Sequence, residues 1–327
     1  MAGFGWDRQA TEGEVTTKPK IKAIAPWFGG KRTLAAVIVE ELGPHKSYWE
    51  PACGSMAVLF AKEPSSHETV NDLHGDLVNL ARVVQGPAAP ELYDRLQRTL
   101  MCEDLVLEAK AKVSEPYRAQ GNGDADRAYW YFLISWAGRN GVSGTRRSNY
   151  QMAVRWTSGG GSGAIRFCSA VHSLPWWHQR LRRVEILCRD LFAIVPRIDD
   201  QVGTVLYLDP PYFRSGARSG SQAYLYDFQP VDHQRLATEA RRFQKARVVV
   251  SYYDHPDLPE LYPGWTRRMV YRQKNLHVQN RRGAGQCLAP EVLLINGPSF
   301  AAEAPEIPRA PGKAGRAGKE SPGARRE

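Results

Sequence analysis

The stretch Val205–Tyr212, with the sequence VLYLDPPY, constrains the fold of this chain more than any other. Its four apolar residues predict a strand that is buried on both faces, as in a parallel sheet. The strand must end at Pro210 and Pro211, because proline has no N–H to donate to a neighbouring strand. Ligands bind at the carboxyl ends of central strands in open α/β sheets. We therefore expect Asp209, the Pro210 carbonyl and Tyr212 to lie together at a binding site.

These three groups suit a planar base that carries an exocyclic amino group. The amino group can donate hydrogen bonds to the Asp209 carboxylate and the Pro210 carbonyl, while the ring stacks on Tyr212. Both acceptors would polarise the amino nitrogen toward an electrophile placed on its other side. The alternative is purely structural: a strand that ends in a proline-rich turn, with Asp209 capping the next helix.

Charge and cysteine content narrow the class of protein. The net charge of +10 and the isoelectric point near 9.4 predict a polyanionic partner. No run of 18 apolar residues predicts a membrane span, and the N-terminus lacks the apolar segment of a secretion signal. The five cysteines are scattered without a C-x-x-C pair, which argues against a zinc site and a disulfide framework. We therefore expect a cytoplasmic protein that binds neither a membrane nor a metal.

A pattern early in the chain is typical of the first half of a nucleotide-binding βαβ unit. A short strand, Ser47–Glu50, runs into the turn Pro51–Met56 and then into the apolar helix Ala57–Ala61. A second strand, Glu68–Asp72, ends on a carboxylate at the spacing where such folds bind ribose hydroxyls. Asp72 could instead cap the helix that follows it.

The segment Trp27-Phe28-Gly29-Gly30-Lys31 precedes a helix predicted over residues 33–42. Paired glycines let the backbone approach a ligand closely. Lys31 can meet a carboxylate, and Trp27 or Phe28 can cover a flat ring. A tight turn with a surface lysine would have the same sequence, so this segment alone does not decide between the two.

Residues 86–183 interrupt the α/β pattern. Helical periodicity is present near residues 91–112 and 126–136, and a flexible glycine loop is expected over 159–163. From residue 137 to residue 183 there are eight arginines and no Asp, Glu or Lys; the arginines are residues 139, 146, 147, 155, 166, 180, 182 and 183. Arginine suits phosphates and guanine edges, and surface charge is usually mixed in sign. We therefore expect groove contact with nucleic acid rather than an ordinary solvated face.

The α/β pattern resumes after this insert. Strands are predicted over residues 184–190, 205–208, 246–252, 266–271 and 290–295, and helices over 191–198 and 232–244. A Gly-Ala-Gly sequence at 283–285 predicts a hairpin loop between the last two strands. Together with the two early strands, this predicts an α/β fold with a seven-stranded, Rossmann-like sheet that is mostly parallel, with an antiparallel last strand.

The predicted organisation has four parts. A flexible arm covers residues 1–20, and a catalytic α/β domain covers 21–85 and 184–298. A mainly helical recognition insert covers 86–183. A basic tail, residues 299–327, is rich in Ala, Pro, Gly, Lys and Arg and is expected to be disordered.

Four motifs occur in an order that resembles the Dam-like, D12-class DNA adenine-N6 methyltransferases. They are Trp27–Lys31, Glu50–Ser55, Asn71-Asp72 and Asp209–Tyr212, with a variable insert before the last. The likeness covers roughly residues 24–297, which is most of the chain.

The resemblance implies S-adenosylmethionine as methyl donor and, as acceptor, an adenine rotated out of double-stranded DNA. It implies a catalytic motif at Asp209, Pro210, Pro211 and Tyr212. The implied donor-binding residues are Trp27, Phe28, Gly29, Gly30, Lys31, Glu50, Pro51, Gly54, Ser55, Asp72, Asp190 and Asp209. The expected DNA contacts are Arg139, Asn140, Arg146, Arg147, Asn149 and Arg155. Such an enzyme would work at the nucleoid of a bacterium or in a phage-infected cell.

Other interpretations stay open at this point. Cytosine-N4 or RNA methylation would use a related tetrapeptide, and a DNA-binding protein could retain the fold without binding the donor. In the turn after the first strand, Ala52 and Met56 replace the family's aromatic residue and second glycine. The last alternative rests on Met56 alone, because methionine disfavours positive φ. The recognition sequence, a cognate restriction endonuclease, and the choice between monomer and weak dimer are not specified by the sequence.

Overall fold

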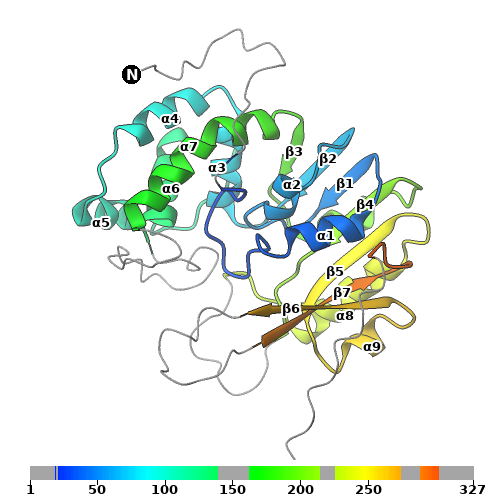
Figure 1. Ribbon diagram of the computed structural model, residues 1–327. Helices are drawn as coiled ribbons and strands as arrows, with labels where there is room; N and C mark the ends of the chain where they lie inside the picture. Colours follow the sequence, from blue (N-terminus) through cyan, green and yellow to red (C-terminus); the bar gives the residue numbers. More distant parts are fainter. Residues whose placement is uncertain (1–18, 20, 139–161, 214–224, 274–287, 302–327) are drawn as a thin grey trace, which may run out of the picture.

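The computed structural model describes residue 19 and residues 21–138, 162–213, 225–273 and 288–301. They form a seven-stranded sheet with helices on both faces and a group of helices beyond one edge (Figure 1). The strands are β1 (Ser47–Glu50), β2 (His67–Asn71), β3 (Val184–Leu187), β4 (Thr204–Leu208), β5 (Arg247–Tyr253), β6 (Thr266–Gln273) and β7 (Leu288–Ile295).

The order of the strands explains where a ligand can bind. The order is β3-β2-β1-β4-β5-β7-β6, and all pairs from β3 to β5 are parallel. β7 lies between β5 and β6 and runs antiparallel to both, which confirms the predicted antiparallel last strand. The chain builds β2 and β3 on one side of β1 and β4 and β5 on the other, so the order reverses between β1 and β4. A crevice forms outside the carboxyl ends of the strands at such a point.

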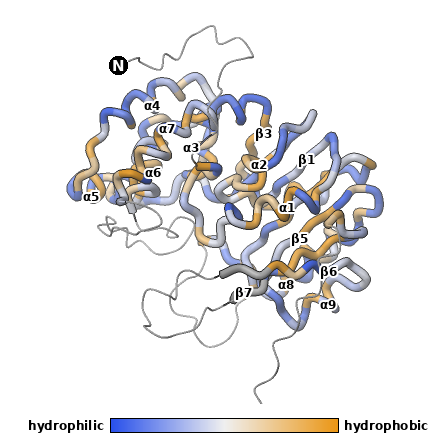
Figure 2. Tube along the Cα trace, viewed as in Figure 1, coloured by the Kyte–Doolittle hydropathy of each residue, from blue (hydrophilic) through white to orange (hydrophobic). Residues whose placement is uncertain are grey.

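Alternating side chains of the strands enter two hydrophobic clusters, one on each face of the sheet. In β4, Val205 and Tyr207 belong to the first cluster, and Leu206 and Leu208 belong to the second. The first face is covered by α1 (Ala35–Leu42), α2 (Ala57–Ala61) and α3 (Gly75–Gln85), and the second by α8 (Pro230–Arg241) and α9 (Leu258–Leu261). Burial on both faces is the reason that β4 is an unbroken apolar run. Figure 2 shows that the buried strand β5 is hydrophobic, whereas the outer helix α4 (Ala89–Gln97) is hydrophilic.

The insert contains α4, α5 (Glu103–Lys112), α6 (Ala125–Ala137) and α7 (Gly163–Leu181). The sequence did not predict α7, because Gly163 and the internal Pro175 both disfavour a helix. The helix forms because the Ser162 side chain caps it, accepting from the Ile165 N–H, and because its inner face is buried. Its Trp177 is fully buried in the first cluster. The insert and the sheet therefore share a continuous hydrophobic core.

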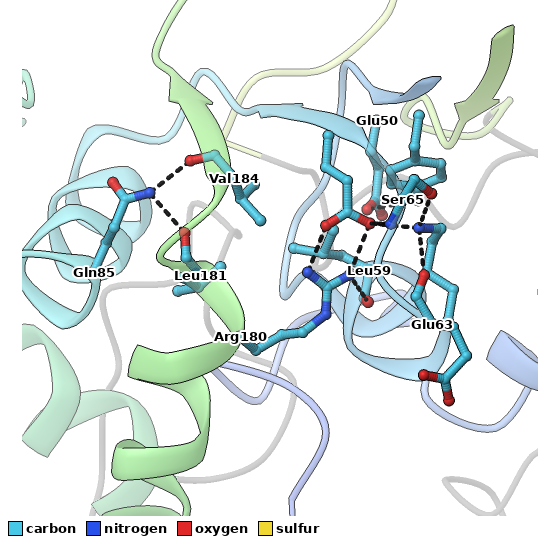
Figure 3. A network of polar contacts seen from close by, with 11 residues as sticks. Glu50, Leu59, Glu63, Ser65, Gln85, Arg180, Leu181 and Val184 are labelled. Atoms are coloured by element: carbon cyan, nitrogen blue, oxygen red, sulfur yellow. Dashed lines mark hydrogen bonds and ion pairs between the residues drawn. The ribbon is translucent and has the colours of Figure 1, made fainter. Parts of the chain in front are cut away.

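A buried network of charged groups attaches α7 to the sheet (Figure 3). Arg180 pairs with Glu68 of β2 and donates to the Leu59 carbonyl of α2 at 3.1 Å. Lys62 pairs with the same carboxylate. The side chain of Arg180 is only 7% exposed, so its assignment to the nucleic-acid surface was wrong and its role is structural.

Several element boundaries differ from those predicted. The helical region 91–112 is two helices, α4 and α5, with a break between them. Residues 191–198 form two short 3-10 turns, η1 (Leu191–Ala193) and η2 (Val195–Arg197), the second with a proline in its first turn. The predicted strand over 184–190 ends at Leu187, because the Arg189 N–H bonds to the Asn71 side chain instead of continuing a ladder.

Candidate active site

A cavity of about 470 Å³ opens at the carboxyl ends of β1, β2 and β4. This volume lies within the range of roughly 300–1,000 Å³ that is typical of small-molecule sites. The lining residues that the sequence predicted are Trp27, Phe28, Gly30, Lys31, Glu50, Pro51, Gly54, Ser55, Asp72, Asp190, Asp209 and Pro211. Gly29, Pro210 and Tyr212 belong to the same segments but do not line the cavity.

The turn after β1 forms one wall, and Asp72 closes it. The Asp72 carboxylate accepts from the Gly54 N–H at 2.8 Å and from the His74 N–H at 2.9 Å. Burial raises the pKa of Asp72, and the backbone N–H groups partly oppose this rise. Gly54 has φ of 46°, and a Cβ there would lie 2.7 Å from the Trp27 indole nitrogen. Glycine therefore lets Trp27 lie directly on the turn.

Met56 ends the same turn in the left-handed conformation, with φ of 59°, alone among the non-glycine residues that the structure describes. This conformation costs about 1–2 kcal/mol for a residue with a Cβ. The side chain is fully buried, and burial of a methionine contributes roughly 1.5–3 kcal/mol. The departure from glycine at this position is thus compatible with the turn, which removes the main support for a fold that cannot bind the donor.

Glu50 ends β1 at the cavity with a side chain that is almost fully buried. The Tyr48 hydroxyl donates to its Oε2 at 2.8 Å. Burial raises the pKa of Glu50 to about 8, and the neighbouring Asp209 carboxyl contributes to the same rise. A cationic group bound in the cavity would favour the carboxylate form.

Asp209 follows β4 and faces the cavity with its side chain 18% exposed. Its Oδ2 lies 3.0 Å from Lys31 Nζ, and its Oδ1 accepts from the Ser251 hydroxyl at 2.9 Å. Lys31 also donates to the Gly29 carbonyl at 2.8 Å. Lys31 and Asp209, which come before and after the insert in the sequence, are therefore in direct contact at the site.

Tyr212 lies beneath these groups and is only 8% exposed. Lys31 Nζ is 4.8 Å from the centre of its ring, and the Tyr253 ring packs edge-on at 4.7 Å. The next residue, Phe213, is stacked between the imidazoles of His233 and His255, at 3.7 and 4.3 Å between ring centres. A base that stacks on the Tyr212 ring must therefore displace either Lys31 or Tyr253.

Several residues of the cavity were not predicted. They are His74, Phe192, Phe228 and Arg235, among others. Phe192 stacks on Phe228 at 5.6 Å between ring centres, and the Arg235 guanidinium lies 4.3 Å from the Phe192 ring. The available signal for Phe192 was its place two residues after the acidic Asp190. No such signal marked His74, Phe228 or Arg235 in the sequence.

The site has the groups that an adenosyl amino acid needs. Carboxylates at three strand ends can accept from hydroxyl and amino groups, the turn offers a close backbone, and aromatic rings offer a flat apolar surface. Within the described residues, no cluster of His, Cys, Asp or Glu is arranged to hold a metal ion, and no helix is long and apolar enough to cross a membrane. The expected DNA contacts at Arg139, Asn140, Arg146, Arg147, Asn149 and Arg155 lie outside the described residues.

Comparison with known proteins agrees with this chemistry. The family model of the D12 class N6 adenine-specific DNA methyltransferases matches residues 27–279. A DNA adenine methylase of Serratia marcescens is 25% identical over 293 residues, which cover 84% of this chain and 98% of that protein. The Retron Ec67 DNA adenine methylase of Escherichia coli is 22% identical over 292 residues, covering 85% of this chain and 92% of that protein. The alternatives of cytosine-N4 and RNA methylation find no support in these matches, and the chain belongs to the D12 class of N6 adenine-specific DNA methyltransferases.

Proposed function

We propose that this DNA adenine-N6 methyltransferase binds its donor in the cavity between β1, β2 and β4 and presents a flipped adenine to Asp209. The observation that carries the proposal is the position of Asp209 on the cavity wall, held from both sides by Lys31 and Ser251. Members of the family use S-adenosylmethionine, which supplies a methyl group attached to a positively charged sulfur.

Three carboxylates divide the binding of the donor between them. Asp72, fixed by two backbone N–H groups, accepts from the ribose hydroxyls. Glu50 takes the amino group of the methionine part, because a buried carboxyl beside a cation is stabilised as its anion. Asp190 accepts from the adenine amino group of the donor, with the ring against Phe192. Trp27 and the Gly54 turn cover the remaining side.

Asp209 acts on the substrate base. Its carboxylate and the Pro210 carbonyl accept the N6 hydrogens, so that the nitrogen lone pair is directed to the methyl carbon. The Asp209 carboxylate can then accept the proton that N6 loses after transfer. The Ser251 hydroxyl holds the carboxylate in place, and Lys31 pairs with its other oxygen. Most of the acceleration then comes from positioning the two reactants.

The adenine must leave the duplex before it can reach Asp209, and extrusion costs a few kcal/mol. Stacking on the Tyr212 ring offsets part of this, by about 1–3 kcal/mol per stacked base.

Contacts to the duplex come from the insert, through Arg139, Asn140, Arg146, Arg147, Asn149 and Arg155. Replacing Arg146 and Arg147 with alanine is expected to make the salt dependence of DNA binding shallower, by about 0.9 in slope for each phosphate that is no longer neutralised. An unchanged slope would remove them from the interface.

The decisive variant is Asp209→Asn, which keeps the shape of the side chain. Methyl transfer is expected to fall below the detection limit while binding of S-adenosylmethionine and of DNA persists. Activity above about a tenth of wild type would contradict the role, since a tenfold decrease corresponds to only about 1.4 kcal/mol of barrier. Digestion of methylated DNA should yield N6-methyladenine, and single-molecule sequencing of the same DNA reports the recognition site.

A further inference from the structure

The Lys31 ammonium lies between two carboxylates, one directly after β4 and one in β7. Its Nζ is 3.0 Å from Asp209 Oδ2 and 4.0 Å from Glu291 Oε2. Lys31 is 4% exposed and Glu291 is 2% exposed. Glu291 comes from β7 and does not line the cavity, and its contacts at the site are with Lys31 and Tyr212. We therefore expect Glu291 to act on the reaction through these two neighbours.

The hydrogen bonds around Ser251 show how Glu291 is connected to the site. The carboxylate of Asp209 accepts only, so the Ser251 hydroxyl donates its hydrogen to it, at 2.9 Å. Ser251 must then accept from the Tyr207 hydroxyl at 2.9 Å. The single hydrogen of the Tyr212 hydroxyl is shared between Ser251 and Glu291, both at 3.3 Å. Glu291 thus contacts both Lys31 and the tyrosine of the catalytic motif.

Lys31 as it stands opposes the proposed role of Asp209. An ammonium 3.0 Å from the carboxylate occupies and partly neutralises the oxygen that would accept a hydrogen bond from the adenine amino group. Positive charge develops on N6 as it takes the methyl group, and a nearby cation disfavours that charge, most strongly in a site closed to water. A second buried carboxylate beside Lys31 compensates for both effects.

We propose that Glu291 is a positioning residue that takes over the Lys31 ammonium when the adenine amino group binds to Asp209. One N–H group of Lys31 then turns from Asp209 to Glu291, while another stays hydrogen-bonded to the Gly29 carbonyl. The Asp209 carboxylate can then accept a hydrogen bond from the base. This inference rests on the proposed role of Asp209.

The test is Glu291→Gln, which keeps the shape of the side chain and removes its charge. We expect kcat to fall by at least tenfold, while the Kd for S-adenosylmethionine and the KM for DNA change by less than about threefold. Glu41→Gln is the matched control, because Glu41 is equally buried and pairs with Arg247 and Arg268 away from the site. It is expected to lower the melting temperature without lowering kcat in the folded enzyme. Wild-type kcat in Glu291→Gln would overturn the proposal.

A double-mutant cycle separates this role from a general disruption of the fold. If Glu291 acts through Lys31, adding Glu291→Gln to Lys31→Met should lower kcat by less than about twofold further. Effects that multiply would show that the two residues act independently and would refute the proposal. If Glu291→Gln does not fold, Glu291→Asp retains the charge but withdraws it by one methylene, and kcat should still fall; a wild-type value would refute the proposal equally.

The proposed roles of Asp209 and Glu291 can be contradicted separately. An active Asp209→Asn enzyme contradicts the proposed function. An inactive Asp209→Asn enzyme together with a fully active Glu291→Gln enzyme contradicts only the role of Glu291.

Discussion

The carboxyl group of Glu50 is buried at the end of β1, and its pKa rises from an ordinary value of 4.5 to about 8. In the unfolded chain this group releases its proton near pH 4.5, whereas the folded protein keeps the proton until about pH 8. The folded state therefore binds more protons than the unfolded state within this window, and stability falls as pH rises through it. The contribution is constant below pH 4.5 and again above pH 8.

We predict that Glu50→Gln stabilises the free protein and weakens its binding to the donor. The difference in unfolding free energy between the variant and wild type should widen by up to about 1.4 kcal/mol per pH unit between pH 4.5 and 8. The affinity for S-adenosylmethionine should fall at least tenfold at pH 8. Thermal unfolding across pH and isothermal titration measure the two effects. A stability difference that does not vary with pH would show that Glu50 is not protonated in the folded protein.

Gly54 and Gly203 both have positive φ, but only Gly54 lies at the cavity. Gly54→Ala places a Cβ 2.7 Å from the Trp27 indole, whereas Gly203, with φ of 84°, has no atom within 4 Å of its would-be Cβ. Both alanine variants should be destabilised by about 1–2 kcal/mol, because φ is positive at both positions. Only Gly54→Ala should also bind S-adenosylmethionine more weakly, by tenfold or more. Urea unfolding and donor titration test this, and equal affinities in the two variants would contradict it.

Among the elements, α7 depends on a buried ion pair for its attachment to β2. Removing one partner of a buried pair leaves an uncompensated charge and costs about 3–5 kcal/mol. Arg180→Ala should therefore destabilise the protein by about this amount in urea unfolding. Arg182→Ala, two residues later and exposed, should change stability by less than about 0.5 kcal/mol. Similar effects in the two variants would mean that the network around Glu68 does not hold the helix.

The regular elements were largely predictable because one local signal specified each. β1 and α2 match their predicted bounds, and the other strands of the parallel part end within a few residues of the predictions. In α7 the local signals were misleading, because Gly163 and Pro175 suggested a break and only tertiary burial of Trp177 overrides them. The sequence also could not show that β7 inserts between β5 and β6, since strand order depends on long-range packing.

In the site too, residues with a local sequence signal were predictable, and residues that depend on long-range packing were not. Motif residues such as Lys31, Asp72 and Asp209 were predicted because each follows a recognisable strand or glycine pair, and the structure brings them around one cavity. Ser251 and Glu291 were missed because they lie inside strands that read as ordinary core. A serine in β5 and a glutamate in β7 acquire significance only when register places them beside Asp209 and Lys31.

At the scale of the whole molecule, the sheet depends on residues near its C-terminal end. β7 supplies four consecutive buried apolar residues, Val292–Ile295, and separates β5 from β6. A chain that ends at residue 287 is expected to remain unfolded and to bind no S-adenosylmethionine. A chain that ends at residue 301 should match the full-length protein in melting temperature and donor affinity. Circular dichroism and donor titration distinguish these outcomes, and donor binding by the shorter chain would contradict the dependence on β7.

The pairing of Lys31 with Glu291 also sets the time at which a newly made chain becomes an enzyme. The two residues are 260 positions apart, so a ribosome moving at about 5–20 residues per second needs roughly 13–50 s to pass from one codon to the other. For the last 79 codons of that interval, from 212 to 291, the nascent protein carries its DPPY motif but not yet Glu291 of β7. A premature stop or frameshift before the codon of Glu291 is therefore expected to yield no methylating fragment.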